Sequence, residues 1–309
     1  YDGIYLYSSS NNNITGNTVS NNRNLGIYLD SSSNNNITDN FASNNIHGIH
    51  LSSSGNNVVT DNVVNSNGQG IHLWSSSSNN VITGNTASNN IYCGISLYDS
   101  SNNVITGNFA SDNGYNGIYL NSSNDNDITD NFASDNVWCG IILLSSSSNN
   151  NLTGNTVSNN GDGIGLSYSS NNDLTDNIVS NNDQGIYLVS SSDYNTIYNN
   201  YFNNTYNAYD GGNNIWNIAK TTGVNIIGGP YVGGNYWSDY EGKDLDDDKL
   251  GDTLIPYNCS GSIKNGGDYH PLIGPYTPPG TPVETATGTG TAYFATDEGT
   301  IAALVAINK

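Results

Sequence analysis

The sequence has few positively charged residues and no long apolar run. Six Lys and Arg stand against 27 Asp and Glu in 309 residues, so the formal net charge at pH 7 is −21. A chain with this charge is expected to repel nucleic acid and anionic lipid, and neither is predicted as a partner. The longest apolar run, residues 301–307, is too short to cross a membrane, so direct membrane insertion is not predicted.

Helical periodicity is also missing. No window offers the roughly 10 to 12 residues at helical spacing that an amphipathic helix requires. The chain instead repeats a unit of 22 to 24 residues, in which Gly-Ile-x-Leu precedes a Ser/Asn run, an apolar residue and Thr-Gly/Asp-Asn. A short and regular repeat predicts a solenoid, because one unit cannot bury its apolar face alone. The glycine that opens the repeat recurs at Gly3, Gly26, Gly48, Gly70, Gly94, Gly117, Gly140, Gly163 and Gly185.

Each repeat contains only short alternating apolar runs separated by turn residues. This pattern predicts one coil of a parallel β-helix, with neighbouring coils stacked at roughly 4.8 Å and a rod of roughly 40 Å for nine coils. The Ile row from Ile4 to Ile186 and the Leu row from Leu6 to Leu188 should face inward. The Asn row from Asn17 to Asn200 is interpreted as a structural ladder of side-chain amides.

The three cysteines do not form a disulfide framework. Cys93 and Cys139 share a repeat position, but Asn116 holds it on the coil between them. Two coils separate the cysteines by roughly 9.6 Å, which is too far for a disulfide. We expect both to be small buried residues; Cys259 lies outside the repeats.

Several motifs carry a family resemblance over residues 1–276. Asn-Asn-x-Ile-Thr-Gly-Asn accompanies Gly-Ile-Tyr-Leu in the coils, and Gly-Gly-Asn-Tyr-Trp-Ser-Asp-Tyr at 233–240 and Asp-Tyr-His-Pro-Leu at 268–272 follow them. These segments resemble the right-handed parallel β-helix family typified by NosD, described as periplasmic copper-binding, and archaeal surface proteins built from the same repeat. The predicted organisation is regular coils at 1–200, closing coils with an acidic loop at 201–276, a Pro/Thr/Gly linker at 277–291 and a C-terminal β-hairpin at 292–309.

The family description calls for a test of copper ligands. The chain has no Met, three dispersed Cys and four His, whereas copper sites are usually built from these residue types. His50 and His72 hold the same outward position on adjacent coils and could bind a metal weakly, while His47 is expected to point to the other side. A surface stack of the two rings is the favoured interpretation, and a copper chaperone is not predicted.

An acidic loop is the stronger candidate for a metal. Asp244, Asp246, Asp248 and Asp252 alternate at the first, third, fifth and ninth places of an EF-hand-type loop. Lys249 stands where the turn glycine belongs and Ile255 where the bidentate Glu belongs. We therefore expect structural calcium here, because clustered carboxylates repel one another unless a cation neutralises them; the alternative is a solvated acidic turn.

A catalytic role is not predicted. Pectin and pectate lyases, polygalacturonases and uronate epimerases use parallel β-helices, but their chemistry needs clustered carboxylates or a base beside an acid sugar. The repeats contain one basic residue, Arg23, and outward acids such as Asp30 and Asp99 lie on distant coils. The near-perfect periodicity also argues against an active site.

Aromatic residues flank the inward Leu row on several coils and should form an exposed surface. Such a surface is suited to stacking on sugars or to assembly with another protein. Its members are Tyr5, Tyr7, Tyr28, Trp74, Tyr98, Tyr119 and Tyr187.

The tail favours assembly. An apolar strand-turn-strand after the linker would not be stable alone, and the chain begins in mid-coil with open strand edges that invite another chain. Its apolar residues are Tyr293, Phe294, Ile301, Leu304, Val305 and Ile307. We predict an extracellular, archaeal-type structural subunit that self-assembles into a filament, sheath or surface layer. The alternative is a cell-surface glycan-binding adhesin, and a polysaccharide lyase or epimerase is third. Candidate glycosylation sites are Asn13, Asn36, Asn121, Asn151, Asn203 and Asn258.

Overall fold

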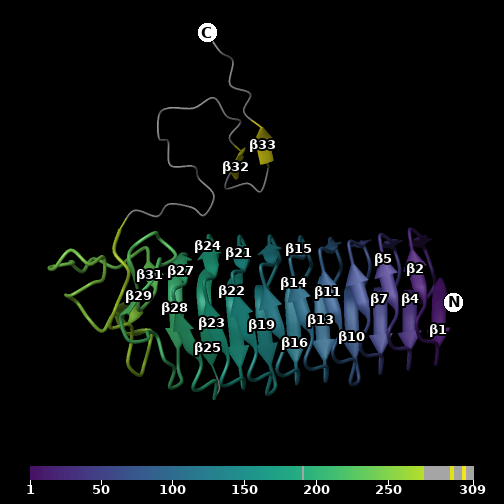
Figure 1. Ribbon diagram of the computed structural model, residues 1–309, viewed down its shortest axis with the longest axis horizontal. Helices are drawn as coiled ribbons and strands as arrows, with labels where there is room; N and C mark the ends of the chain where they lie inside the picture. The colour runs from purple at the N-terminus through teal and green to yellow at the C-terminus, as the bar shows by residue number, and fades with distance from the viewer. Residues whose placement is uncertain (190, 275–292, 296–300, 304–309) are drawn as a thin grey trace, which may run out of the picture.

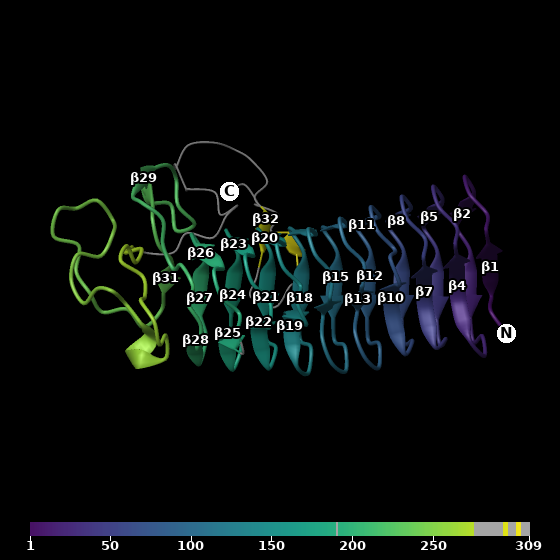
Figure 2. The same cartoon turned by 90° about the horizontal axis from the view of Figure 1, so that it is seen from below.

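The computed structural model describes residues 1–189, 191–274, 293–295 and 301–303. Within these residues the rod is built from three parallel sheets, each receiving one strand from every coil (Figures 1 and 2). Strands pair one-to-one with the next coil, for example Ile4 with Ile27 and Leu6 with Leu29. The predicted parallel β-helix is confirmed, because equivalent repeat positions form columns along the rod.

The strands of each sheet follow one another at every third place in the chain, except that β31 (Tyr236–Trp237) follows β27 (Tyr201–Asn203) in sheet C. Sheet A consists of β1 (Ile4–Tyr7), β4 (Leu25–Asp30), β7 (His47–Ser52), β10 (Gln69–Trp74), β13 (Ile95–Tyr98), β16 (Ile118–Asn121), β19 (Cys139–Leu144), β22 (Asp162–Ser167), β25 (Gln184–Val189) and β28 (Tyr206–Asp210). Sheet B consists of β2 (Asn13–Thr15), β5 (Asn36–Thr38), β8 (Val58–Thr60), β11 (Val81–Thr83), β14 (Val104–Thr106), β17 (Asp127–Thr129), β20 (Asn151–Thr153), β23 (Asp173–Thr175) and β26 (Thr196–Tyr198). Sheet C consists of β3 (Thr18–Ser20), β6 (Phe41–Ser43), β9 (Val63–Asn65), β12 (Thr86–Ser88), β15 (Phe109–Ser111), β18 (Phe132–Ser134), β21 (Thr156–Ser158), β24 (Ile178–Ser180), β27 (Tyr201–Asn203) and β31 (Tyr236–Trp237).

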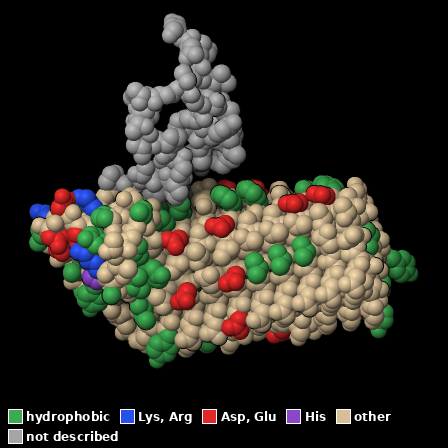
Figure 3. Space-filling view, viewed as in Figure 1, with side chains coloured by type: hydrophobic (Ala, Val, Ile, Leu, Met, Phe, Trp, Pro, Cys, Tyr) green, Lys and Arg blue, Asp and Glu red, His purple; other side chains and the backbone are tan. Residues whose placement is uncertain are grey.

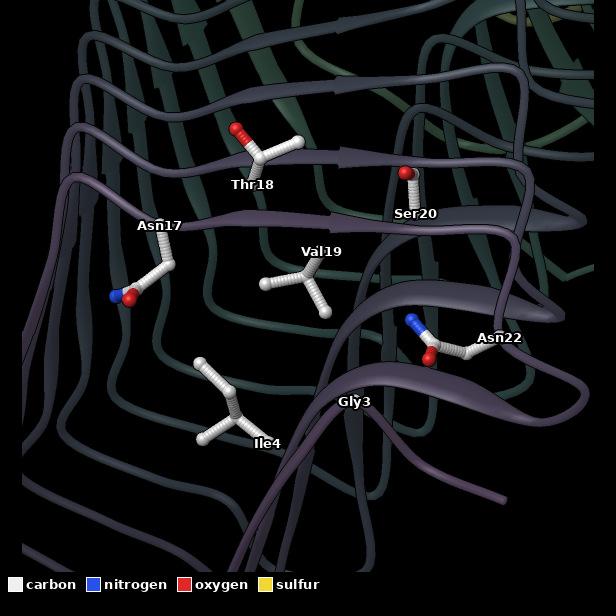
Figure 4. A pocket seen from close by; sticks show the side chains of 7 residues that line it. All are labelled: Gly3, Ile4, Asn17, Thr18, Val19, Ser20 and Asn22. Carbon is white, nitrogen blue, oxygen red and sulfur yellow. The ribbon is translucent and has the colours of Figure 1, made fainter.

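The core is a narrow column of aliphatic side chains enclosed by the three sheets. Figure 4 shows the cross-section at the first coil, where Ile4 and Val19 point into the interior and Thr18 points away from it. From the second coil onward the Ile and Leu rows of sheet A are fully buried, as at Ile27 and Leu29. The predicted inward rows are therefore confirmed.

Asparagine ladders join the coils at all three corners. In the predicted column, each side-chain amide donates to the Oδ1 atom of the Asn on the next coil, from Asn17 to Asn235 at distances of 2.9–3.0 Å. Two further columns run from Asn12 to Asn214 and from Asn22 to Asn204. These bonds satisfy buried amide groups that would otherwise destabilise the corners.

A closing segment caps the last coil with large aromatic side chains. β31 pairs with β27, and Trp237 stacks on Phe202 with ring centroids 4.7 Å apart. Asp268 is fully buried and accepts hydrogen bonds from Trp237 Nε1 at 2.9 Å and from the Asn235 backbone at 2.7 Å. Burial raises the pKa of Asp268 to about 6. The remaining short elements are β29 (Thr221–Thr222), β30 (Tyr231–Val232) and a 3-10 turn at Cys259–Gly261.

Two strands near the C-terminus pair antiparallel, as expected for a hairpin. They are β32 (Tyr293–Ala295) and β33 (Ile301–Ala303), with Phe294 opposite Ala302. Leu304, Val305, Ile307 and the predicted linker at 277–291 lie outside the described residues. Whether the hairpin contacts a second subunit stays a prediction.

The cysteines form no disulfide within the described residues. Cys93 and Cys139 are free and buried, as predicted, and Cys259 is also free and buried. Asn116 lies between the first two and donates to Cys93 Sγ at 3.6 Å. No helix in the described residues is long and apolar enough to cross a membrane.

Candidate functional site

A continuous row of rings lies on the outer surface of sheet A over the first six coils. The register aligns Tyr5, Tyr28, His50 and His72 on successive strands, and Tyr98 lies beside Trp74. Neighbouring ring centroids are 4.9 Å apart for Tyr5–Tyr28, 5.1 Å for Tyr28–His50, 4.9 Å for His50–His72, 5.4 Å for His72–Tyr98 and 5.1 Å for Tyr98–Tyr119. We call this row, with Tyr7 and Trp74, the aromatic face.

The aromatic face is partly open to solvent. Tyr5, Tyr7 and Trp74 are 51%, 63% and 44% exposed. The ring row ends after Tyr119, because Ile142 and Gly165 follow it in the same column. Tyr187 is therefore separate and contacts Tyr209 in a tilted arrangement, with ring centroids 5.2 Å apart. The structure thus brings together six of the seven aromatic residues singled out in the sequence.

Three histidines meet within the aromatic face. One ring nitrogen from each of His47, His50 and His72 lies within 4.8 Å of the others, and the Nδ1 atoms of His47 and His50 are 3.2 Å apart. The expectation that His47 points to the other side is wrong. A Cβ atom on Gly48 would lie 2.2 Å from the core side chain of Val64. Positions 48 and 49 thus both face inward. Side-chain direction therefore does not alternate between these two residues, and His47 lies on the same outer face as His50.

The surroundings of the histidines keep them neutral. His50 and His72 are 9% and 5% exposed although their strand positions face outward. Burial lowers the pKa of His47 to about 4, of His50 to about 3 and of His72 to about 2, with neighbouring rings adding to the effect for the last two. At neutral pH the three imidazoles therefore carry lone pairs and no charge.

A second stack of exposed rings was not anticipated from the sequence. Tyr92, Tyr115 and Trp138 lie on successive coils in the turn before sheet A, with centroids 5.5 and 5.1 Å apart. They are 48%, 40% and 58% exposed. Their common spacing of 23 residues was the available signal.

The acidic loop brings together three of its four predicted carboxylates. Asp244, Asp246 and Asp252 each place an oxygen within 4.8 Å of the others. Asp248 is outside this group, because it pairs with Lys220 and accepts a hydrogen bond from the Leu250 backbone at 2.7 Å. Calcium binding by the loop stays a prediction.

Charged groups elsewhere are distributed unevenly. Figure 3 shows acidic side chains dispersed over the visible face of the rod and mixed with basic ones at the closing end.

The candidate glycosylation residues are all at least partly exposed, and modification stays a prediction for Asn13, Asn36, Asn121, Asn151, Asn203 and Asn258.

Comparison with known proteins identifies a family and a shared fold. The family model described as periplasmic copper-binding protein (NosD) matches residues 1–93 and 77–242. The A-module of the mannuronan C-5 epimerase AlgE6 from Azotobacter vinelandii is 17% identical, with a TM-score of 0.60 over 67% of this chain and 61% of that one. The periplasmic alginate epimerase AlgG is 26% identical, with a TM-score of 0.53 over 57% and 47%.

A third similar structure is an enzyme in complex with a different compound, DFA-III. DFA-IIIase from Arthrobacter chlorophenolicus A6, in complex with DFA-III, is 13% identical, with a TM-score of 0.52 over 66% of this chain and 54% of that one. The described chain thus spans about half to three fifths of the length of these structures. Comparison with curated proteins finds no match.

The expectation that the chain is not an enzyme is contradicted by these likenesses. The similar structures include an alginate epimerase at 26% identity, built on the same kind of coil. Regular periodicity does not argue against a site in this chain. That periodicity belongs to the inward columns, whereas outward positions vary freely and here carry His and aromatic residues.

Proposed function

The chain belongs to the NosD family. We propose that it is an exported polysaccharide-active protein that binds its glycan along the aromatic face. The observation that carries the proposal is the unbroken ring row from Tyr5 to Tyr119. An exposed apolar surface with polar groups set into it is typical of a ligand-binding site.

The spacing and polarity of the face suit a sugar chain. Adjacent rings are 4.9–5.4 Å apart along the rod, which is comparable with the length of one sugar residue, so successive sugars can contact successive coils. Tyr5 Oη already contacts Asp30 Oδ2 at 3.4 Å, and such groups can bond sugar hydroxyls. With a net charge of −21 and Arg23 as the single basic residue of the repeats, the face favours neutral glycans over uronates.

Export is supported by the matched family and by one of the similar structures. The matched family and the similar epimerase AlgG are both described as periplasmic proteins. A cell-surface location, the finer expectation from the sequence, belongs to the same proposal. Self-assembly into a filament or layer stays a prediction, because its strongest support came from the tail at residues 277–309, most of which lies outside the described residues.

The test is glycan binding with matched aromatic variants. Affinity electrophoresis and calorimetry compare wild type, Trp74→Ala and Trp138→Ala on neutral glycans, alginate and pectate. Trp74→Ala should weaken binding by tenfold or more, because it removes a ring of the face, while Trp138→Ala on the second stack should bind as wild type does. Equal affinity of the two variants, or no binding to any glycan, would refute the proposal.

The same incubations report on turnover and assembly. Reducing-end assays and NMR of the recovered glycan detect cleavage or epimerisation. Electron microscopy of the unbound protein detects polymers. Ordered filaments from a protein that binds no glycan would favour the assembly prediction in place of the proposed function.

A further inference from the structure

The histidine cluster has the composition of a transition-metal site. Its donors are three imidazoles on two adjacent strands, β7 and β10, whose backbones are held by the sheet ladder. Neutral imidazole suits zinc and copper, whereas calcium and magnesium prefer oxygen ligands. The cluster therefore selects for late first-row metals over the hard cations.

The distances fit a shared ion for two of the ligands. Two imidazole nitrogens bound tetrahedrally at about 2.0–2.1 Å from zinc are separated by about 3.3 Å. The Nδ1 atoms of His47 and His50 are 3.2 Å apart. His72 stacks on His50 with a centroid distance of 4.9 Å and contacts His47 edge-on at 4.7 Å. One ring nitrogen of His72 lies within 4.8 Å of a nitrogen of each of the other two.

The surroundings hold the rings in place. Ser96 Oγ lies 2.8 Å from His72 Nδ1 and donates in turn toward Gln69 Oε1 at 3.4 Å. Partners of this kind orient metal-binding imidazoles.

We propose that His47, His50 and His72 bind one Zn²⁺ or Cu²⁺ ion. The site differs from the weak two-histidine pair expected from the sequence, because His47 supplies the closest contact. It lies inside the aromatic face, with the His72 and Trp74 centroids 5.8 Å apart. A metal there would place positive charge in a strongly acidic molecule. The proposal does not depend on glycan binding.

The first experiment measures metal stoichiometry and affinity on the full chain after chelator treatment. Calorimetry with Zn²⁺ and with Cu²⁺ should show one tight site, and Ca²⁺ should not compete for it. His47→Gln should weaken binding by tenfold or more, because it removes one ligand at a partly exposed position. His270→Gln, the fourth histidine of the chain, is the matched control and should bind as wild type does.

The second experiment locates the ion. Cu²⁺ quenches nearby indoles, so it should quench fluorescence from Trp74, and the quenching step should vanish in Trp74→Phe while the stoichiometry is kept. Electron paramagnetic resonance of the copper form should show coupling to nitrogen ligands that decreases in His47→Gln. Equal affinity of wild type and His47→Gln, with circular dichroism confirming that both are folded, would overturn the proposal. So would quenching that persists in Trp74→Phe.

Discussion

Replacing one ladder asparagine should destabilise the rod far more than its size suggests. Asn108 is fully buried, and its Oδ1 atom accepts hydrogen bonds from the backbone N–H and the side-chain amide of Asn85, both at 3.0 Å. Its own amide donates to the Ile82 carbonyl at 2.8 Å and to Asn131 Oδ1 at 3.0 Å. Asn108→Ala removes all of these bonds at once.

The size of the destabilisation depends on which hydrogen-bond partners of Asn108 keep another partner in the variant. The Asn85 side-chain amide still donates to Val59 at 2.9 Å, and Asn131 Oδ1 still accepts from the Asn108 backbone at 3.0 Å. The Asn85 backbone N–H loses its acceptor while buried, which costs about 1–3 kcal/mol, and the lost amide bonds contribute about 1 kcal/mol each. Asn108→Ala should therefore lower the free energy of unfolding by about 2–5 kcal/mol.

Urea denaturation followed by circular dichroism measures this loss. The matched control is Asn13→Ala, because Asn13 is exposed and its amide makes no hydrogen bond to another described residue. The control should change the free energy of unfolding by less than about 0.5 kcal/mol. If Asn108→Ala destabilises no more than Asn13→Ala, the ladder bonds do not stabilise the corners and the reasoning is refuted.

Two further predictions concern the corners and the closing segment. Gly70→Ala should lower the free energy of unfolding by about 1–3 kcal/mol, because the added Cβ would lie 2.3 Å from the Gly94 carbonyl oxygen. The urea midpoint should fall accordingly. Gly107→Asp should be nearly neutral, since that position is open and Asp61 holds the equivalent turn at a φ of 54°; a reversed order of the two variants would contradict this. Burial raises the pKa of Asp268 from 3.8 to about 6, so its contribution to stability is full below about pH 4 and is lost as the pH rises through 6. The stability of wild type relative to Asp268→Asn should accordingly fall between pH 4 and 6 in urea titrations, and a constant difference across that window would show that this carboxyl does not titrate as described.

The candidate site was only partly predictable. Strand alternation placed Tyr5, Tyr28 and Trp74 on one outward face, because side-chain direction alternates strictly within a strand. It failed for His47, which lies beyond the corner at Gly48, where two successive positions face inward. It also missed the stack through Tyr92, Tyr115 and Trp138, since a turn has no alternation from which side-chain directions can be read.

The sequence by itself determined the parallel β-helix, its inward columns and the existence of an asparagine ladder. A repeat that returns every 22 to 24 residues stacks like on like, so each position of one coil specifies a column of the whole rod. Only the tertiary structure decided which outward side chains meet. The contact of His47 with His50 and His72 depends on how the backbone turns at a corner, and packing between neighbouring coils sets that turn. Local pattern does not specify it.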